Sequence, residues 1–162
     1  MPALIQRIVE PATVSIDTHL PIINQDIIYE SHANEGYLYN HSGYGLKVSD
    51  KPRGVTRVRS KENLLTFIQI AQQLMLIQSK ETGEFLTVSS RGKISSSFLA
   101  TEGSLWRMEN KSTHKKFQSF TNKSTDCTLS VNRRGKVLCR RGARKRSTSF
   151  ITISRPRSNR RL

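Results

Sequence analysis

The sequence is poor in cysteine, tryptophan and acidic residues, with two, one and twelve of them among 162. Two cysteines exclude a scaffold held together by many disulfides. Apolar runs such as residues 74–77 are far shorter than the roughly 20 residues that cross a bilayer, so we expect no membrane insertion. Residues 1–10 do not combine a basic start with a long apolar block, and no secretory leader is visible.

Motifs for catalysis and for metal or cofactor binding are also missing. The four histidines His19, His32, His41 and His114 are scattered, and none has a metal-binding spacing to another histidine, a cysteine or an acid. The chain contains neither a phosphate-cradling glycine motif nor a nucleophile elbow. We therefore predict that the protein is not an enzyme and has no metal site and no cofactor.

Positive charge is abundant, and it is concentrated near the carboxyl end. The formal net charge is +15, and Asp126 is the single acid after Asn110. Eight cations fall within fourteen residues: Arg133, Arg134, Lys136, Arg140, Arg141, Arg144, Lys145 and Arg146. Exposed charges at this density repel one another by roughly 0.2 to 1 kcal/mol per close pair. An anionic polymer is thus a better explanation than a solvated loop without a partner.

Two kinds of polyanion fit this basic stretch. Sulfated or phosphorylated polymers would be bound by lysine point charges and by forked arginine donors, with released counterions adding to the affinity. Nucleic acid is the competing partner, because the stretch also resembles a nuclear-localisation sequence. No aromatic residues for base stacking are interleaved with the cations, and no zinc-finger motif is present, so nucleic acid is the less favoured alternative.

A phrase of the form Leu-x-Val, polar turn, glycine and β-branched residue occurs three times, at residues 46–55, 86–94 and 129–137. Alternating apolar and polar residues predict a half-buried strand. The glycine suits a tight turn that needs a positive φ, and the β-branched residue resumes the strand pattern. Each copy therefore predicts a β-hairpin, and the third copy continues directly into the basic stretch.

Further strands are predicted at residues 37–39, 64–70, 74–78, 104–108, 117–120 and 149–153. About twelve strands in three pseudo-repeats predict an all-β fold, a β-trefoil, whose closed barrel removes exposed sheet edges. A β-propeller has a similar repeat length but needs at least four blades. We expect residues 1–35 to be a partly disordered extension, with a strand or short helix at residues 4–9. Residues 36–154 would form the trefoil, and residues 155–162 a mobile basic tail.

The two cysteines, Cys127 and Cys139, flank the third predicted hairpin. Counting back from the turn leaves them out of direct opposition. We therefore expect free, partly buried thiols, with a disulfide as the alternative.

The order and spacing of several fragments resemble the fibroblast growth factor family over residues 36–154. Leu38-Tyr39 and the first Leu-x-Val copy resemble the opening strands of that family. Residues 92–96 followed by 104–108, residues 117–120, and the third hairpin with residues 147–150 resemble later strands. The sequence departs from the family at Ser104, where a cysteine is usual, and at Met108, where a glutamate is expected. The basic loop is also about two residues shorter than usual.

This resemblance implies a secreted ligand that binds and activates a receptor tyrosine kinase, with heparan sulfate as co-receptor. The positions matching the receptor-binding residues of the family are Tyr39, Phe117, Gln118, Ile151 and Ile153. The heparin-binding positions would be Asn132, Arg133, Arg134, Lys136, Arg140, Arg141, Arg144, Lys145 and Arg146. Trp106 and the other phenylalanines are expected in the core. The alternative is an intracellular or nuclear trefoil protein whose basic patch binds nucleic acid or a protein.

Overall fold

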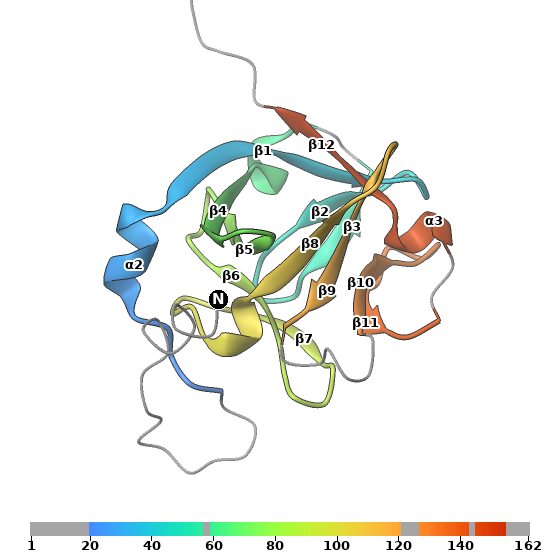
Figure 1. The fold of residues 1–162 in the computed structure, drawn as a ribbon. Helices are drawn as coiled ribbons and strands as arrows, with labels where there is room; N and C mark the ends of the chain where they lie inside the picture. Colours follow the sequence, from blue (N-terminus) through green and yellow to red (C-terminus); the bar gives the residue numbers. More distant parts are fainter. Residues whose placement is uncertain (1–19, 57–58, 121–126, 143–144, 155–162) are drawn as a thin grey trace, which may run out of the picture.

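The computed structural model describes residues 20–56, 59–120, 127–142 and 145–154 (Figure 1). The strands of these residues are β1 (His32–Asn40), β2 (Gly45–Lys47), β3 (Arg53–Val55), β4 (Leu65–Ala71), β5 (Leu74–Ser79), β6 (Phe85–Val88), β7 (Ile94–Ser97), β8 (Trp106–Asn110), β9 (Lys115–Ser119), β10 (Thr128–Val131), β11 (Val137–Arg140) and β12 (Phe150–Ser154). The short helices are α2 (Gln25–Glu30), α3 (Lys145–Thr148) and the 3-10 turns η1 (Lys61–Asn63) and η2 (Glu102–Ser104). None of these helices is long and apolar enough to cross a membrane.

Six of the strands form a closed antiparallel barrel. The pairs β1–β4, β4–β5, β5–β8, β8–β9, β9–β12 and β12–β1 complete the ring. The remaining strands form three hairpins, β2–β3, β6–β7 and β10–β11, which pair with β1, β5 and β9 respectively. Each third of the chain thus supplies two barrel strands and one hairpin (Figure 1). The predicted β-trefoil is confirmed. Because the barrel is closed, each of its six strands has a neighbour on both sides and no edge is left unpaired.

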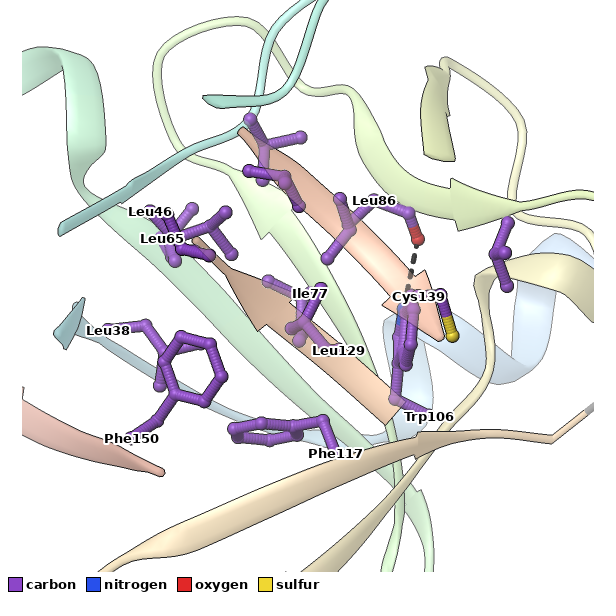
Figure 2. Packing of buried hydrophobic residues seen from close by; sticks show 14 of the residues in the cluster. Leu38, Leu46, Leu65, Ile77, Leu86, Trp106, Phe117, Leu129, Cys139 and Phe150 are labelled. Atoms are coloured by element: carbon purple, nitrogen blue, oxygen red, sulfur yellow. Dashed lines mark hydrogen bonds between the residues drawn. The ribbon is translucent and has the colours of Figure 1, made fainter. Parts of the chain in front are cut away.

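The repeated phrase supplies equivalent core positions in the three hairpins. Its leucines and valines have at most 1% exposed surface: Leu46, Val48, Leu86, Val88, Leu129 and Val131. Figure 2 shows Leu46, Leu86 and Leu129 converging in the same interior cluster. The two-residue period that predicted these strands is therefore the period with which they bury side chains.

The three glycines of the phrase serve two different purposes. Gly92 and Gly135 have φ values of 85° and 80°, as the turn prediction requires. Gly54 instead lies inside β3, where a Cβ atom would come within 2.5 Å of Val131 Cγ1. In the first copy, therefore, glycine permits close packing of two hairpins, and the expected positive φ is absent.

The largest side chains fill the barrel. Trp106 is fully buried, and its indole Nε1 donates a hydrogen bond of 3.1 Å to the carbonyl oxygen of Leu86 (Figure 2). The rings of Phe117 and Phe150 pack edge to face with centroids 5.9 Å apart. Both phenylalanines have 0% exposed surface. Trp106 and these aromatic rings form the centre of the core.

Residues 20–35, which we expected to precede the domain as a partly disordered extension, are part of it: residues 21–23 pair with residues 100–102, and residues 32–35 pair with β4. Ile23 is fully buried, and its backbone nitrogen donates to the carbonyl of Ala100 at 2.9 Å. The α2 helix begins after Asn24, whose side chain caps the amide of Asp26. The expected boundary at residue 36 lies inside β1. The predicted element at residues 4–9 and the tail at 155–162 lie outside the described residues.

Cys127 and Cys139 form a disulfide, with their Cα atoms 5.1 Å apart. The β10–β11 register places Cys139 opposite Leu129, and Cys127 lies two residues before Leu129. The two-residue period puts both cysteines on the same side of the hairpin, where they meet diagonally. The expectation of free thiols was wrong, because a strand count near a turn does not reveal a diagonal contact.

The buried position of Phe117 leads to a first prediction. Phe117→Ala should lower the free energy of unfolding by about 3 to 5 kcal/mol, because it removes a ring and leaves a cavity in the barrel. Phe98→Ala, the same substitution at a side chain that is 69% exposed, should change stability by no more than about 0.5 kcal/mol. Urea unfolding of both variants measures the difference, and equal losses would contradict the assigned packing.

Candidate polyanion-binding surface

The third hairpin holds its turn with one side chain and exposes its cations. The Asn132 Oδ1 oxygen accepts hydrogen bonds from the backbone nitrogens of Arg134 and Lys136, at 2.9 and 3.0 Å. Strand alternation turns Val137 inward, while Lys136 and the side chains of Arg133 and Arg134 are exposed. Asn132 therefore organises the turn, and the neighbouring cations are available to an anion.

The turn between β1 and β2 is hydrogen-bonded to this hairpin. The buried Asn40 donates from Nδ2 to the carbonyl of Val131 at 2.9 Å, and its Oδ1 accepts from the backbone nitrogens of Ser42 and Tyr44 at 3.1 Å each. The Tyr44 hydroxyl donates to the carbonyl of Arg133 at 2.8 Å. Asn40 and Tyr44, which are distant in the sequence, thereby hold the backbone of the cationic turn in place.

The end of the basic stretch forms the helical turn α3, where a loop was expected. Ser147 and Thr148 are buried, whereas Lys145 and Arg146 are exposed. The hydroxyls of Thr148 and Ser149 donate to the carbonyl of Lys145 at 3.2 and 2.7 Å. These small hydroxyl residues anchor the turn and leave its two cations facing solvent.

A hollow of about 440 Å³ lies between the third hairpin and α3. Its lining consists of Ser130, Asn132, Arg133, Arg134, Leu138, Arg140, Gly142 and Ser147. Four of the nine predicted heparin-binding residues are among them. Lys136, Arg141, Lys145 and Arg146 are exposed nearby along the chain, and Arg144 lies outside the described residues. None of the described lining residues is acidic, and forked guanidinium donors around such a hollow suit sulfate or phosphate groups.

The structure adds Arg53, which sequence reasoning missed. Arg53 and Lys136 are partners in an isolated antiparallel bridge, and the backbone nitrogen of Gly54 donates to the carbonyl of Gly135 at 2.7 Å. Partners in such a bridge point to the same side. The exposed Arg53 side chain therefore lies on the same side as Lys136 and adds to the cationic surface. The sequence signal that could have identified Arg53 is its place in the first copy of the repeated phrase.

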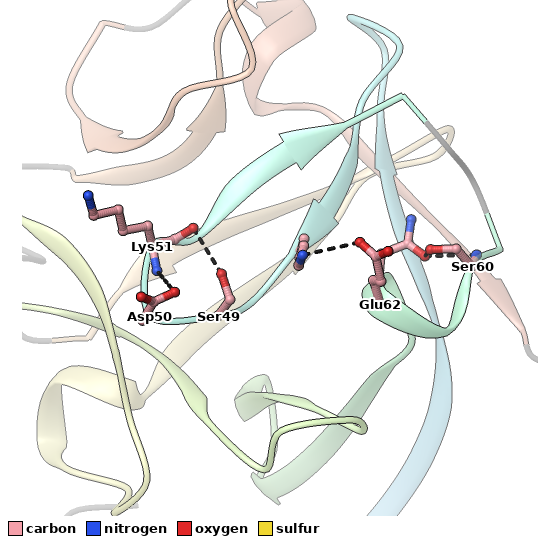
Figure 3. A network of polar contacts seen from close by, with 7 residues as sticks. Ser49, Asp50, Lys51, Ser60 and Glu62 are labelled. Carbon is pink, nitrogen blue, oxygen red and sulfur yellow. Dashed lines mark hydrogen bonds and ion pairs between the residues drawn. The ribbon is translucent and has the colours of Figure 1, made fainter.

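Acids accompany the cations of the first hairpin (Figure 3). Lys47 Nζ lies 3.1 Å from Glu62 Oε2. Asp50 Oδ1 accepts from the backbone nitrogen of Lys51 at 3.0 Å. In the third hairpin and α3 the described residues contain no acid at all. The excess positive charge therefore belongs to the third repeat.

The predicted receptor-binding residues fall into three different places. Tyr39 pairs with Ile151 across β1 and β12, and Tyr37 pairs with Ile153 two positions along. These four side chains share one face of the two strands. Ile151 is 38% exposed, and Tyr39 and Ile153 are half-buried. We refer to Tyr39, Ile151 and Ile153 as the apolar patch.

Phe117 was wrongly expected to belong to that surface. It has no exposed area, because strand alternation on β9 points it into the barrel. Its neighbour Gln118 points outward into a separate hollow of about 400 Å³, which Glu109 and Lys116 also line. Met108 lies at the edge of that hollow and packs partly against the core.

Comparison with known protein families finds a match over most of the chain. Residues 34–152 match the model of the family described as Fibroblast growth factor. A search of curated proteins found no significant match. The matched span runs from β1 into β12 and contains the cationic hairpin, α3 and two residues of the apolar patch, Tyr39 and Ile151.

A histidine pair borders the cationic surface. The rings of His41 and His114 lie edge to face with centroids 6.0 Å apart, and His114 Nε2 is buried without a hydrogen-bond partner. Desolvation lowers the pKa of His114, and the nearby His41, Lys145, Lys116 and Lys111 lower it further. The folded protein therefore favours the neutral form of this imidazole.

This environment predicts acid sensitivity. Because the folded-state pKa of His114 is lowered, the unfolded chain binds more protons, and stability should fall as the pH drops through about 6.5. His114→Gln should flatten the dependence of melting temperature on pH between about 7.5 and 5.5. His32→Gln, at an exposed position, is the control. Parallel pH profiles for the two variants would show that His114 does not contribute.

Proposed function

The chain belongs to the fibroblast growth factor family, whose members are non-enzymatic signalling ligands and are generally secreted. On this basis, we propose that it is a secreted growth-factor-like ligand. It binds and activates a receptor tyrosine kinase, and heparan sulfate is its co-receptor. The observation that carries this proposal is the hollow lined by Asn132, Arg133, Arg134 and Arg140 beside the exposed cations of α3.

Sulfate groups match this surface chemically. Arginine presents a planar fork of donors to an oxyanion, and lysine supplies a mobile point charge. Ser130 and Ser147 also line this hollow. A sulfated polymer would release counterions when it binds, so its affinity should fall steeply with salt.

Nucleic acid would use the same charges but would gain less from the rest of the surface. Base stacking needs exposed aromatic faces, and the part of the chain that the structure describes places no aromatic residue in the lining of the hollow. Tyr44, which is nearby, uses its hydroxyl to hold the carbonyl of Arg133. A nuclear protein that binds nucleic acid is therefore the second candidate, supported by charge alone.

The disulfide between Cys127 and Cys139 supports secretion independently of charge. Disulfides form and persist in oxidising compartments and are rare in the cytosol and nucleus. This bond joins the two sides of the cationic hairpin, so its presence would also stabilise the proposed binding surface.

The apolar patch is the proposed centre of the receptor interface. It combines the ring of Tyr39 with the exposed Ile151 and the half-buried Ile153 on one face of β1 and β12. A desolvated cluster of aromatic and aliphatic side chains typically supplies most of the binding energy in such interfaces. Gln118 lies on β9, in a different hollow, and we propose it as a peripheral contact.

Heparin binding tests the cationic surface. The third-hairpin variant, Arg134→Gln with Arg140→Gln, should bind heparin about 2- to 30-fold more weakly at moderate salt, from roughly 0.2 to 1 kcal/mol per lost contact. The slope of log affinity against log salt should fall by about one to two. The control variant, Lys61→Gln with Lys80→Gln, removes the same charge at exposed positions elsewhere and should bind nearly as the parent does.

Equal affinities of the third-hairpin and control variants would place the heparin site elsewhere. Competition on the parent protein separates the two candidate polyanions. Heparin should displace duplex and single-stranded DNA at far lower concentration than either displaces heparin, and the opposite order would favour the nucleic-acid alternative.

Receptor binding tests the apolar patch. Tyr39→Ala with Ile151→Ala should reduce affinity for a receptor tyrosine kinase ectodomain at least tenfold, because truncating a central contact typically costs more than about 1 kcal/mol. Heparin affinity should be unchanged. Phe98→Ala with Leu99→Ala truncates two exposed apolar side chains outside the patch and serves as the control. An ectodomain that binds the parent and the patch variant equally well would rule out this patch.

A further inference from the structure

The β6–β7 hairpin repeats the turn of the third hairpin, although the proposed function leaves it unused. Ser89 Oγ accepts from the backbone nitrogens of Arg91 and Lys93, at 3.2 and 3.1 Å. Asn132 makes the same pair of contacts in the third hairpin, with the residues 43 positions later in each case. Both turns close on a glycine with positive φ, and the side chains of Arg91 and Lys93 are exposed.

A hollow of about 550 Å³ lies against this second hairpin. Arg91 and Lys93 line it, together with the hydroxyl-bearing residues Ser89, Ser95 and Thr101. Leu20 gives it an apolar side. Among the described residues, no acidic and no aromatic side chain is part of the lining. The acid of this hairpin, Glu84, is buried and accepts a hydrogen bond from Ser96. The hollow thus combines cations and hydroxyl groups with an apolar wall.

The second hairpin adjoins the cationic surface of the third. A Cβ atom placed on Gly92 would lie 3.4 Å from the carbonyl oxygen of Cys139. The residue after Cys139 is Arg140, which lines the first hollow. Gly92 is flanked by Arg91 and Lys93, so the turn of the second hairpin meets the end of β11, next to Arg140. The threefold fold therefore places the cationic turn of the second hairpin against the strand of the third hairpin that carries Arg140.

We infer that the β6–β7 hairpin is a second subsite for the sulfated polysaccharide, used by chains long enough to leave the first hollow and cross Cys139. The inference rests on the proposed function, because the same polymer occupies both sites. Sulfates would contact Arg91 and Lys93, and the hydroxyls of Ser89 and Ser95 would bond to sugar or sulfate oxygens. Occupancy of the first hollow raises the effective concentration of the chain at the second.

Chain length is the variable that tests this subsite. The second-hairpin variant, Arg91→Gln with Lys93→Gln, is compared with the control variant, Lys61→Gln with Lys80→Gln, on heparin tetrasaccharide and on dodecasaccharide. We expect tetrasaccharide affinity within about twofold of the control, and a loss of about 3- to 20-fold for the dodecasaccharide. The third-hairpin variant should weaken both lengths. Melting temperatures and the single substitutions Arg91→Gln and Lys93→Gln check that folding is unaffected.

Three results would overturn the inference. Equal affinities of the second-hairpin and control variants at both lengths would show that the hairpin does not bind the polymer; the proposed function would stand if the third-hairpin variant still lost affinity. An equal loss at both lengths would show one merged site in place of a separate, length-dependent subsite. If the parent protein binds neither oligosaccharide, the proposed function itself fails, and this inference fails with it.

Discussion

Closure of the barrel by pairing of β1 with β12 is the constraint on which the rest of this molecule depends. It joins the first and last strands, which are more than a hundred residues apart in the sequence, over five registered pairs from Gly36 to Asn40. Because the ring has no edge, short strands with few residues each remain paired. The same closure places Tyr39 beside Ile151 and brings the basic stretch against the turn held by Asn40.

Scaffold and surface share the same hairpins without competing for the same residues. The inward positions of each hairpin fill the core with leucine and valine, and the outward positions and turns carry the charge. A side-chain oxygen at the start of the turn, from Ser89 or Asn132, holds the backbone in the second and third hairpins. Mutual repulsion among the cations is tolerated because the packing beneath them does not depend on their partners.

Local patterning predicted much of the fold and part of the site. Strands followed from the two-residue period, and the trefoil from three copies of one phrase. Phe117 and Gln118 show where such reasoning ended: adjacent residues on a strand face opposite sides, and the sequence did not indicate which of the two was buried. Packing of residues 20–35 was missed because it depends on contacts with distant parts of the chain, and the Cys127–Cys139 bond was missed because counting from the turn does not reveal a diagonal contact.

The sequence by itself determined the strands, their threefold repetition and the concentration of positive charge after Asn110, because these depend on local alternation and composition. Only the tertiary structure decided which charges act together. Arg53 joins Lys136, and the turn between Arg91 and Lys93 packs against Cys139, because the hairpins of a closed trefoil pack side by side. The physical reason is that the binding of an anionic polymer depends on the distances between charges in space. Closure of the barrel sets those distances for residues that are far apart in the chain.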